Sequence, residues 1–472
     1  MSDDDHTTPT SDGDRTEPTP DNDRTEPTPD NDRTEPTPDG DRDGSWLRDL
    51  TLYAILGLVF VGTLSTSLAA PALPGIVDAF SISEARAGLV MTAFFAPATL
   101  AIPVMGWAAD RYGRRPVVLA SVFVFGVAGA GVAFADAFRT VLVLRTVQGI
   151  AFPGTLPLSI ALIGDLYAGR EATTAQGFRV SVNGVTGVVM PAVAGVAAGL
   201  SWRVPFALYA LALPAFVLCL IALPESTVGG DTPADDGDAP ADDGDGATHR
   251  PERASTHSVA RGATDGGVAA RLAGARASAV ELAGAMTPTI RVLVVATISL
   301  FLVRFALLTY VPVYLVRTVG ASDAVGGIAV SVLGLGRFVV APAAGAVVAR
   351  IGPRRAVVGG LAIFATGTVA LVASAEPVVV VTLMALLSVG EGVVNPVVND
   401  VVTNEATADV RGRVVSALEG GKSGAVAVSP ALFGAVLAAT TYRTIFLAGG
   451  LVVAASALLV RLGPFAEESA GA

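Results

Sequence analysis

The stretch Gly106-Trp-Ala-Ala-Asp110-Arg111-Tyr-Gly113-Arg114-Arg115 separates two long apolar runs. A short polar turn between two such runs must lie at a membrane surface, because only there do its backbone and charges reach water. Its three arginines favour the cytoplasmic side. Gly113 permits a tight turn, and Gly106 lets a neighbouring helix approach closely. Asp110 can accept hydrogen bonds from the N-terminus of a neighbouring helix.

The composition also indicates a membrane protein. The chain has 472 residues, is 52% hydrophobic and has a mean hydropathy of +0.60. Many apolar runs exceed the length that crosses a bilayer, so we expect a polytopic membrane protein. The formal charge of −11 comes from residues 1–44, which hold fifteen acids and four arginines, and not from an acidic binding site. A single lysine among 31 basic residues, together with these acidic segments, indicates a salt-loving prokaryote with a GC-rich genome.

The chain divides into five parts. Residues 1–44 are a disordered acidic repeat tail, 45–223 a six-helix half, 224–287 a polar cytoplasmic connector, 288–463 a second six-helix half and 464–472 a tail. The end of the connector, 268–285, has the pattern of an amphipathic surface helix. The twelve expected membrane helices are 50–70, 85–109, 116–135, 139–164, 176–199, 204–223, 290–312, 324–348, 356–374, 377–403, 412–438 and 441–462.

Charge predicts the topology. From the 106–115 turn onward, the connections on the side of that turn hold about fourteen arginines, whereas all the connections on the other side together hold five. Both termini are therefore expected in the cytoplasm, with the chain in the plasma membrane.

An internal repeat indicates two homologous halves. Gly345-Ala-Val-Val-Ala349-Arg350-Ile-Gly352-Pro-Arg354-Arg355 repeats the opening stretch 239 residues later, and Gln148-Gly149 pairs with Glu391-Gly392. Asp110 becomes Ala349 in the second copy, so we expect the first turn to form the stronger latch between conformations.

These motifs resemble those of the major facilitator superfamily, and especially of its drug–proton antiporter branch. The turn and its repeat carry the resemblance, together with Arg145-Thr-Val-Gln148-Gly149 and the Gly187, Pro191, Gly195 series. The resemblance implies twelve helices in two pseudo-symmetric bundles around a central site. It also implies that Arg145 serves coupling, although its depth lets it snorkel to the surface. The glycine series is either an antiport hinge or ordinary close packing. Met190 and Ala194 depart from the antiporter signature.

Ionisable residues at membrane depth are the candidates for proton and substrate handling. Glu391 lies near the midplane of its helix, with Asn395 one turn further on. Its alternative role is a permanent ion pair that joins helices. Arg304 and Arg337 lie at similar depth and are expected to reach Glu391 or Glu419.

Glu419 and Lys422 have the i, i+3 spacing of an intrahelical ion pair, which is either structural or part of the transport path.

We expect a secondary transporter that works by rocker-switch alternating access, exports small amphipathic molecules and is driven by a proton gradient. A sugar or metabolite permease is the alternative, and a sensor or scaffold that transports nothing is a remote one. The sequence carries no nucleotide-binding loop, metal cluster or catalytic elbow, so neither an enzyme nor a cofactor is expected. The expected partners are a small-molecule substrate and the lipid bilayer, without nucleic acid, and the chain is expected to act as a monomer.

Overall fold

The computed structural model describes residues 42–224, 284 and 286–464. Every regular element in these residues is helical, and twelve helical segments among them are long and apolar enough to cross a membrane. The predicted all-α membrane architecture is thus confirmed. The acidic tail up to residue 41, nearly all of the connector with its expected amphipathic helix, and the residues after 464 lie outside the described residues.

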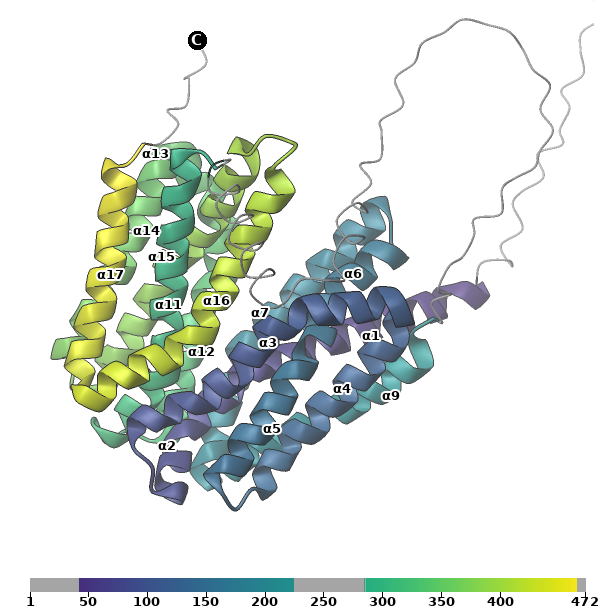
Figure 1. Cartoon of the computed structure of the whole chain (residues 1–472), viewed down its shortest axis with the longest axis horizontal. Helices are drawn as coiled ribbons and strands as arrows, with labels where there is room; N and C mark the ends of the chain where they lie inside the picture. Colours follow the sequence, from purple (N-terminus) through teal and green to yellow (C-terminus); the bar gives the residue numbers. More distant parts are fainter. Residues whose placement is uncertain (1–41, 225–283, 285, 465–472) are drawn as a thin grey trace, which may run out of the picture. The chain divides into compact units, whose positions relative to one another are not determined.

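The first half contains helices α1 to α9, purple to teal in Figure 1. Their bounds are α1 Arg42–Ser67, α2 Ala69–Phe80, α3 Glu84–Tyr112, α4 Arg114–Gly131, α5 Phe138–Ala151, α6 Leu156–Leu166, α7 Gly169–Leu200, α8 Arg203–Ala207 and α9 Ala212–Ala222. The 3-10 turns η2 Phe152–Gly154 and η3 Leu208–Leu211 join successive helices within single spans, whereas η1 Val132–Phe134 ends the span that α4 begins.

The second half repeats this plan in green to yellow. Its helices are α11 Pro288–Arg317, α12 Asp323–Val339, α13 Ala344–Ile351, α14 Pro353–Ala370, α15 Pro377–Glu405, α16 Arg411–Ala439 and α17 Tyr442–Leu462, with 3-10 turns η4 Ala341–Ala343 and η5 Leu371–Ala373.

Prolines explain where the structure differs from the expected spans. The first span ends at Ser67 and a separate helix, α2, follows, because Pro71 cannot donate the hydrogen bond that would continue α1. Pro153 similarly interrupts the fourth span, and Pro342 the eighth. Pro396 leaves α15 continuous from Pro377 to Glu405.

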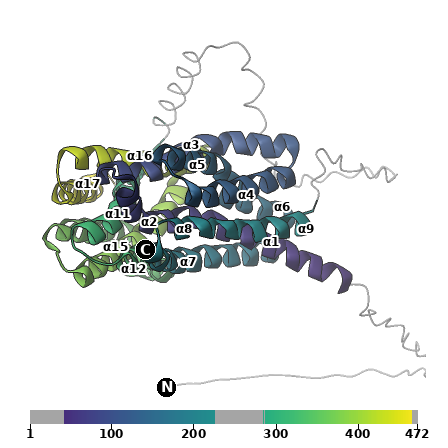
Figure 2. The same cartoon turned by 90° about the horizontal axis from the view of Figure 1, so that it is seen from below.

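Two kinds of helix contact build the protein. Within the halves, α3 packs on α5 and α4 on α9, while α14 packs on α15 and α17. Between the halves, α3 packs on α16, and α7 packs on α12, beside which it lies in Figure 2. Buried side chains are almost all apolar, so the few buried charges stand out: Arg145, Arg304, Glu391 and Lys422.

Candidate functional site: a polar cavity between the two halves

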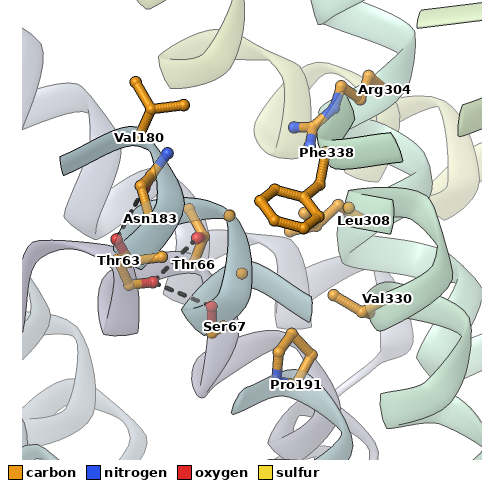
Figure 3. Close-up of a pocket in the computed structure, with 13 residues that line it drawn as sticks. Thr63, Thr66, Ser67, Val180, Asn183, Pro191, Arg304, Leu308, Val330 and Phe338 are labelled. Carbon is orange, nitrogen blue, oxygen red and sulfur yellow. Dashed lines mark hydrogen bonds between the residues drawn. The ribbon is translucent and has the colours of Figure 1, made fainter. Parts of the chain in front are cut away.

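A cavity of about 450 Å³ lies between the halves. Helices α1, α3, α6 and α7 and the 3-10 turn η2 line it from the first half, and α11, α15 and α16 line it from the second. A smaller pocket of about 180 Å³ lies between α7 and α12 and shares several residues with it, including Thr63, Asn183 and Arg304 (Figure 3). Together these spaces form the site that the two-fold repeat predicts.

The first-half wall of the cavity is uncharged. Thr63 Oγ1 lies 2.8 Å from Asn183 Oδ1, which joins α1 to α7 at the cavity surface. Thr66 and Thr99 add hydroxyls to the wall, and Phe95 adds an aromatic ring. Threonine hydroxyls in helices return their hydrogen bonds to the preceding turn, as Thr99 does to Phe95, so these groups can lie in an apolar environment without a charged partner.

The second-half wall carries the charge. Arg304 on α11 donates from Nε to Glu391 Oε2 on α15 at 2.6 Å. Glu391 is fully buried and Arg304 is 7% exposed, but only Arg304 lines the cavity. Glu391 therefore lies behind the arginine and not at the cavity surface.

A second ion pair lies on α16. Lys422 Nζ donates to Glu419 Oε1 at 2.7 Å and to Asn399 Oδ1 at 3.0 Å. The structure thus places the expected i, i+3 pair on the cavity wall. Lys422 is buried, whereas the Glu419 side chain is 58% exposed.

Two other candidates share this wall or this depth. Asn395 lines the cavity, and its Oδ1 has no hydrogen-bond partner among the described residues. Arg337 lies on α12, but its side chain falls outside the described residues.

Arg145 lies away from the cavity, in the core of the first half. It is fully buried, so it does not snorkel to the surface as its depth would have allowed. Its guanidinium donates to Gln148 at 2.7 Å and to Tyr209 at 3.2 Å, and it stacks 4.4 Å from the Phe94 ring centre. These partners hold the side chain inward, and Tyr209 in turn donates to the backbone of α1 at Leu64.

At one end of the helices, the Arg317 end, ion pairs join the two halves. Arg317 at the end of α11 contacts Asp78 of α2, and its Nε lies 3.0 Å from Glu84 of α3. Beneath this cluster, Tyr310 donates to the carbonyl of Pro430 at 2.6 Å. The ion pairs of Arg317 therefore hold the two halves together at this end, and the Tyr310 bond joins α11 to α16 within the second half.

The opposite end holds the two arginine-containing turns. Gly113 and Gly352 adopt φ of +88° and +80°, which confirms the need for glycine at both turns. Arg114 pairs with Asp165 at the end of α6. Asp110 and Arg111 are exposed, and Asp110 has no partner among the described residues.

An arginine of each turn donates a hydrogen bond to the last helix of its own half. Arg115 donates to the carbonyl of Leu220 on α9 at 2.8 Å. Its counterpart Arg354 donates to the carbonyl of Val460 on α17 at 3.3 Å. Arg350 is exposed at the end of α13.

The close helix approach expected at Gly106 is absent from this conformation. A Cβ added to Gly106 would meet no atom of the described residues within 4 Å, and the same holds for its repeat counterpart Gly345.

The Gly187, Pro191, Gly195 series faces the other half. A Cβ on Gly195 would lie 2.8 Å from Gly327 Cα, and a Cβ on Gly334 would lie 3.0 Å from Gly187 O. These glycines let the backbones of α7 and α12 touch. The series therefore does form a packing surface, and that surface is the contact between the halves.

A family model described as Major Facilitator Superfamily matches residues 55–291 and 293–470. The chain belongs to the major facilitator superfamily. Its fold resembles the crystal structure of a D-xylose–proton symporter, with 17% identity, a TM-score of 0.64 and coverage of 88% of this chain and 97% of that one. An inward-facing, unoccupied bacterial homologue of the human lysosomal transporter Spinster gives 18% identity and a TM-score of 0.63, over 88% and 95% of the two chains. At these identities the likeness shows the fold alone.

Relatives within the superfamily include exporters. The bacillibactin exporter of Bacillus subtilis (strain 168) is 29% identical over 162 residues, which cover 33% of this chain and 40% of that protein. The multidrug transporter protein MdtP of the same organism is 26% identical over 183 residues, 39% of this chain and 33% of that protein. These matches thus span only about a third to two fifths of the relatives' own length. They place the chain near the drug–proton antiporter branch.

Sequence reasoning missed part of this site. Asp78 and Glu84 carried no motif, and their partner Arg317 was considered only for topology. Asp78 lies on α2, most of which the expected spans left as a connection between residues 70 and 85. Tyr209 was also missed, because a tyrosine in an apolar run gives no signal of its buried arginine partner.

Proposed function

We propose that this protein is a secondary active transporter that exports small amphipathic molecules by alternating access, driven by the proton gradient. The observation that carries the proposal is the cavity between the two halves, which has buried ionisable groups on one wall. Ion pairs join the two halves at the Arg317 end. A cavity with an apolar, hydroxyl-bearing wall and a charged wall suits an amphipathic molecule. The names of the exporter relatives support the direction.

The accessible side of the cavity follows from its lining. Ile102 and Glu419 both line it, lie on the parts of α3 and α16 nearer the arginine turns, and are 40% and 58% exposed. The cavity therefore opens toward the arginine turns. With those turns in the cytoplasm, as their charge favours, this conformation is the inward-facing one. Asp110 without a partner is consistent with a latch that engages only when this side closes.

Glu391 is the proposed proton site. Its carboxyl is buried and contacts Arg304, the arginine on α11 that lines the cavity. A rearrangement of α11 against α15 would therefore change the partner of this carboxyl. Burial favours the neutral acid when the arginine withdraws, and contact with the arginine favours the carboxylate. Alternating access supplies this change of environment.

Reconstituted vesicles test the proposal. The purified protein would be reconstituted into vesicles with an imposed pH gradient. The flux of amphipathic dyes, sugars and amino acids across these vesicles would then be measured. We expect the dyes to move against the proton flux, and collapse of the gradient with a protonophore to stop their accumulation. Proton-coupled uptake of a sugar instead would support a permease, and absence of flux for the whole panel would contradict a transporter. Vesicles without protein are the control.

A further inference from the structure

The cavity contains a cation whose own partner does not share the cavity. Arg304 lines both pockets, whereas Glu391, to which its Nε donates, is fully buried and lines neither. A molecule in the cavity thus meets the guanidinium first and the carboxylate only behind it.

The unused side of this guanidinium points into the cavity. Neither Nη nitrogen of Arg304 has a hydrogen-bond partner among the described residues, even though the residue is buried, with 7% of its surface exposed. Figure 3 shows the guanidinium directed into the pocket, above Phe338 and Leu308. Four N–H groups in one plane are the donor set that binds a carboxylate through two parallel hydrogen bonds. The buried Glu391 fixes this orientation by holding Nε.

The other charges on the wall do not compete for this role. Lys422 is already held by Glu419 at 2.7 Å and by Asn399 at 3.0 Å. Apolar side chains adjoin the guanidinium on the cavity side, including Phe305 and Leu308. Among the described side chains, the wall therefore offers Arg304 as its open cationic fork, next to an apolar surface.

We propose that Arg304 binds the carboxylate of an amphipathic organic anion, and that Glu391 acts as a positioning residue for it. The transport of such an anion rests on the proposed function, but its binding to Arg304 does not, because binding can be measured without transport. A failure of transport and a failure of carboxylate binding are consequently separate results.

Equilibrium dialysis tests the proposal with ligand series matched in shape but not in charge. Naphthalene, biphenyl and anthracene bodies would each carry a carboxylate, a carboxamide or an aminomethyl group, and the protein would be held in phosphatidylcholine nanodiscs, which contain no anionic lipid. Empty nanodiscs correct for partitioning. We expect at least one carboxylate to bind about 10- to 100-fold tighter than its carboxamide, as a charge-assisted pair to a buried arginine implies. If every carboxylate binds no tighter than its carboxamide, or if the amines bind tightest, the proposal is wrong.

Variants assign any preference to the arginine. Arg304→Gln alone removes the cation that Arg304 supplies to the buried Glu391 and can destabilise the fold, so Arg304→Gln combined with Glu391→Gln is the second variant. The double variant should bind the carboxylate and the carboxamide equally. Arg304→Lys should keep part of the preference, because it keeps the charge and loses the fork. Arg179→Gln is the matched control: Arg179 bonds Gln176 within α7 and lines neither pocket, so its loss should leave the preference intact. A preference that survives in the double variant would overturn the assignment.

Discussion

Adding one methyl group at the contact between α7 and α12 should open the Arg317 end. The Cβ of a Gly195→Ala variant would lie 2.7 Å from Asp323 O and 2.8 Å from Gly327 Cα, both on α12. Ordinary contacts of this kind begin at 3.4 Å. The two helices must therefore separate by about 0.7 Å, and overpacking of this kind costs about 1–3 kcal/mol.

The penalty applies only to the conformation in which α7 and α12 touch. A conformation that opens the Arg317 end separates these helices and avoids the clash, so the equilibrium should move toward it by about 5- to 150-fold. Gly199→Ala is the matched control on the same helix, because a Cβ there would meet no described atom within 4 Å. Both variants gain the same helix propensity from alanine, which leaves the clash as the difference.

Distances between spin labels would measure the shift. Labels at Ala137 and Thr440 lie in exposed connections of the two halves, next to the ends of α5 and α16 on the side of the Arg317 end. Cys219, the only cysteine in the chain, is buried and would be replaced by alanine so that it does not react. We expect a larger population of long distances in Gly195→Ala than in Gly199→Ala. Identical distance distributions in the two variants would refute the reasoning.

Three further predictions concern charges. Arg317→Gln removes both ion pairs at the Arg317 end, which are partly exposed and worth about 0–1 kcal/mol each, so the same labels should report a smaller opening than Gly195→Ala gives. High salt, which screens these ion pairs, should favour opening in the unaltered protein and so reduce its difference from Arg317→Gln. Asp110→Asn should lower turnover in vesicles without changing membrane insertion, and Ala349→Asp should restore part of it; normal flux in Asp110→Asn would contradict the latch. Glu391→Gln keeps the hydrogen bond from the arginine but cannot titrate, so it should abolish proton-driven accumulation and spare substrate binding. Accumulation with unchanged pH dependence would move the proton site elsewhere, with Glu419 tested next.

Local sequence determined the membrane spans because each span carries its own signal. Apolar length, the arginine turns and the internal repeat are all readable without knowing which helices touch. Gly113 and Gly352 show the same locality: a backbone at positive φ needs glycine whatever surrounds it. The i, i+3 pair of Glu419 and Lys422 also formed as helix geometry requires.

Tertiary structure decided which residues meet across helices. Arg304 had two expected acidic partners, Glu391 and Glu419, and only the packing of α11 on α15 selected Glu391. Arg145 lies at a depth from which an isolated helix could reach the surface, but Gln148 and Tyr209 hold it in the core. The need for a small residue at Gly106 depends on whether another helix lies against it, and that changes with conformation. Helix periodicity fixes the face on which a side chain lies, but the neighbour of that face is set by how twelve helices pack, and no single segment encodes it.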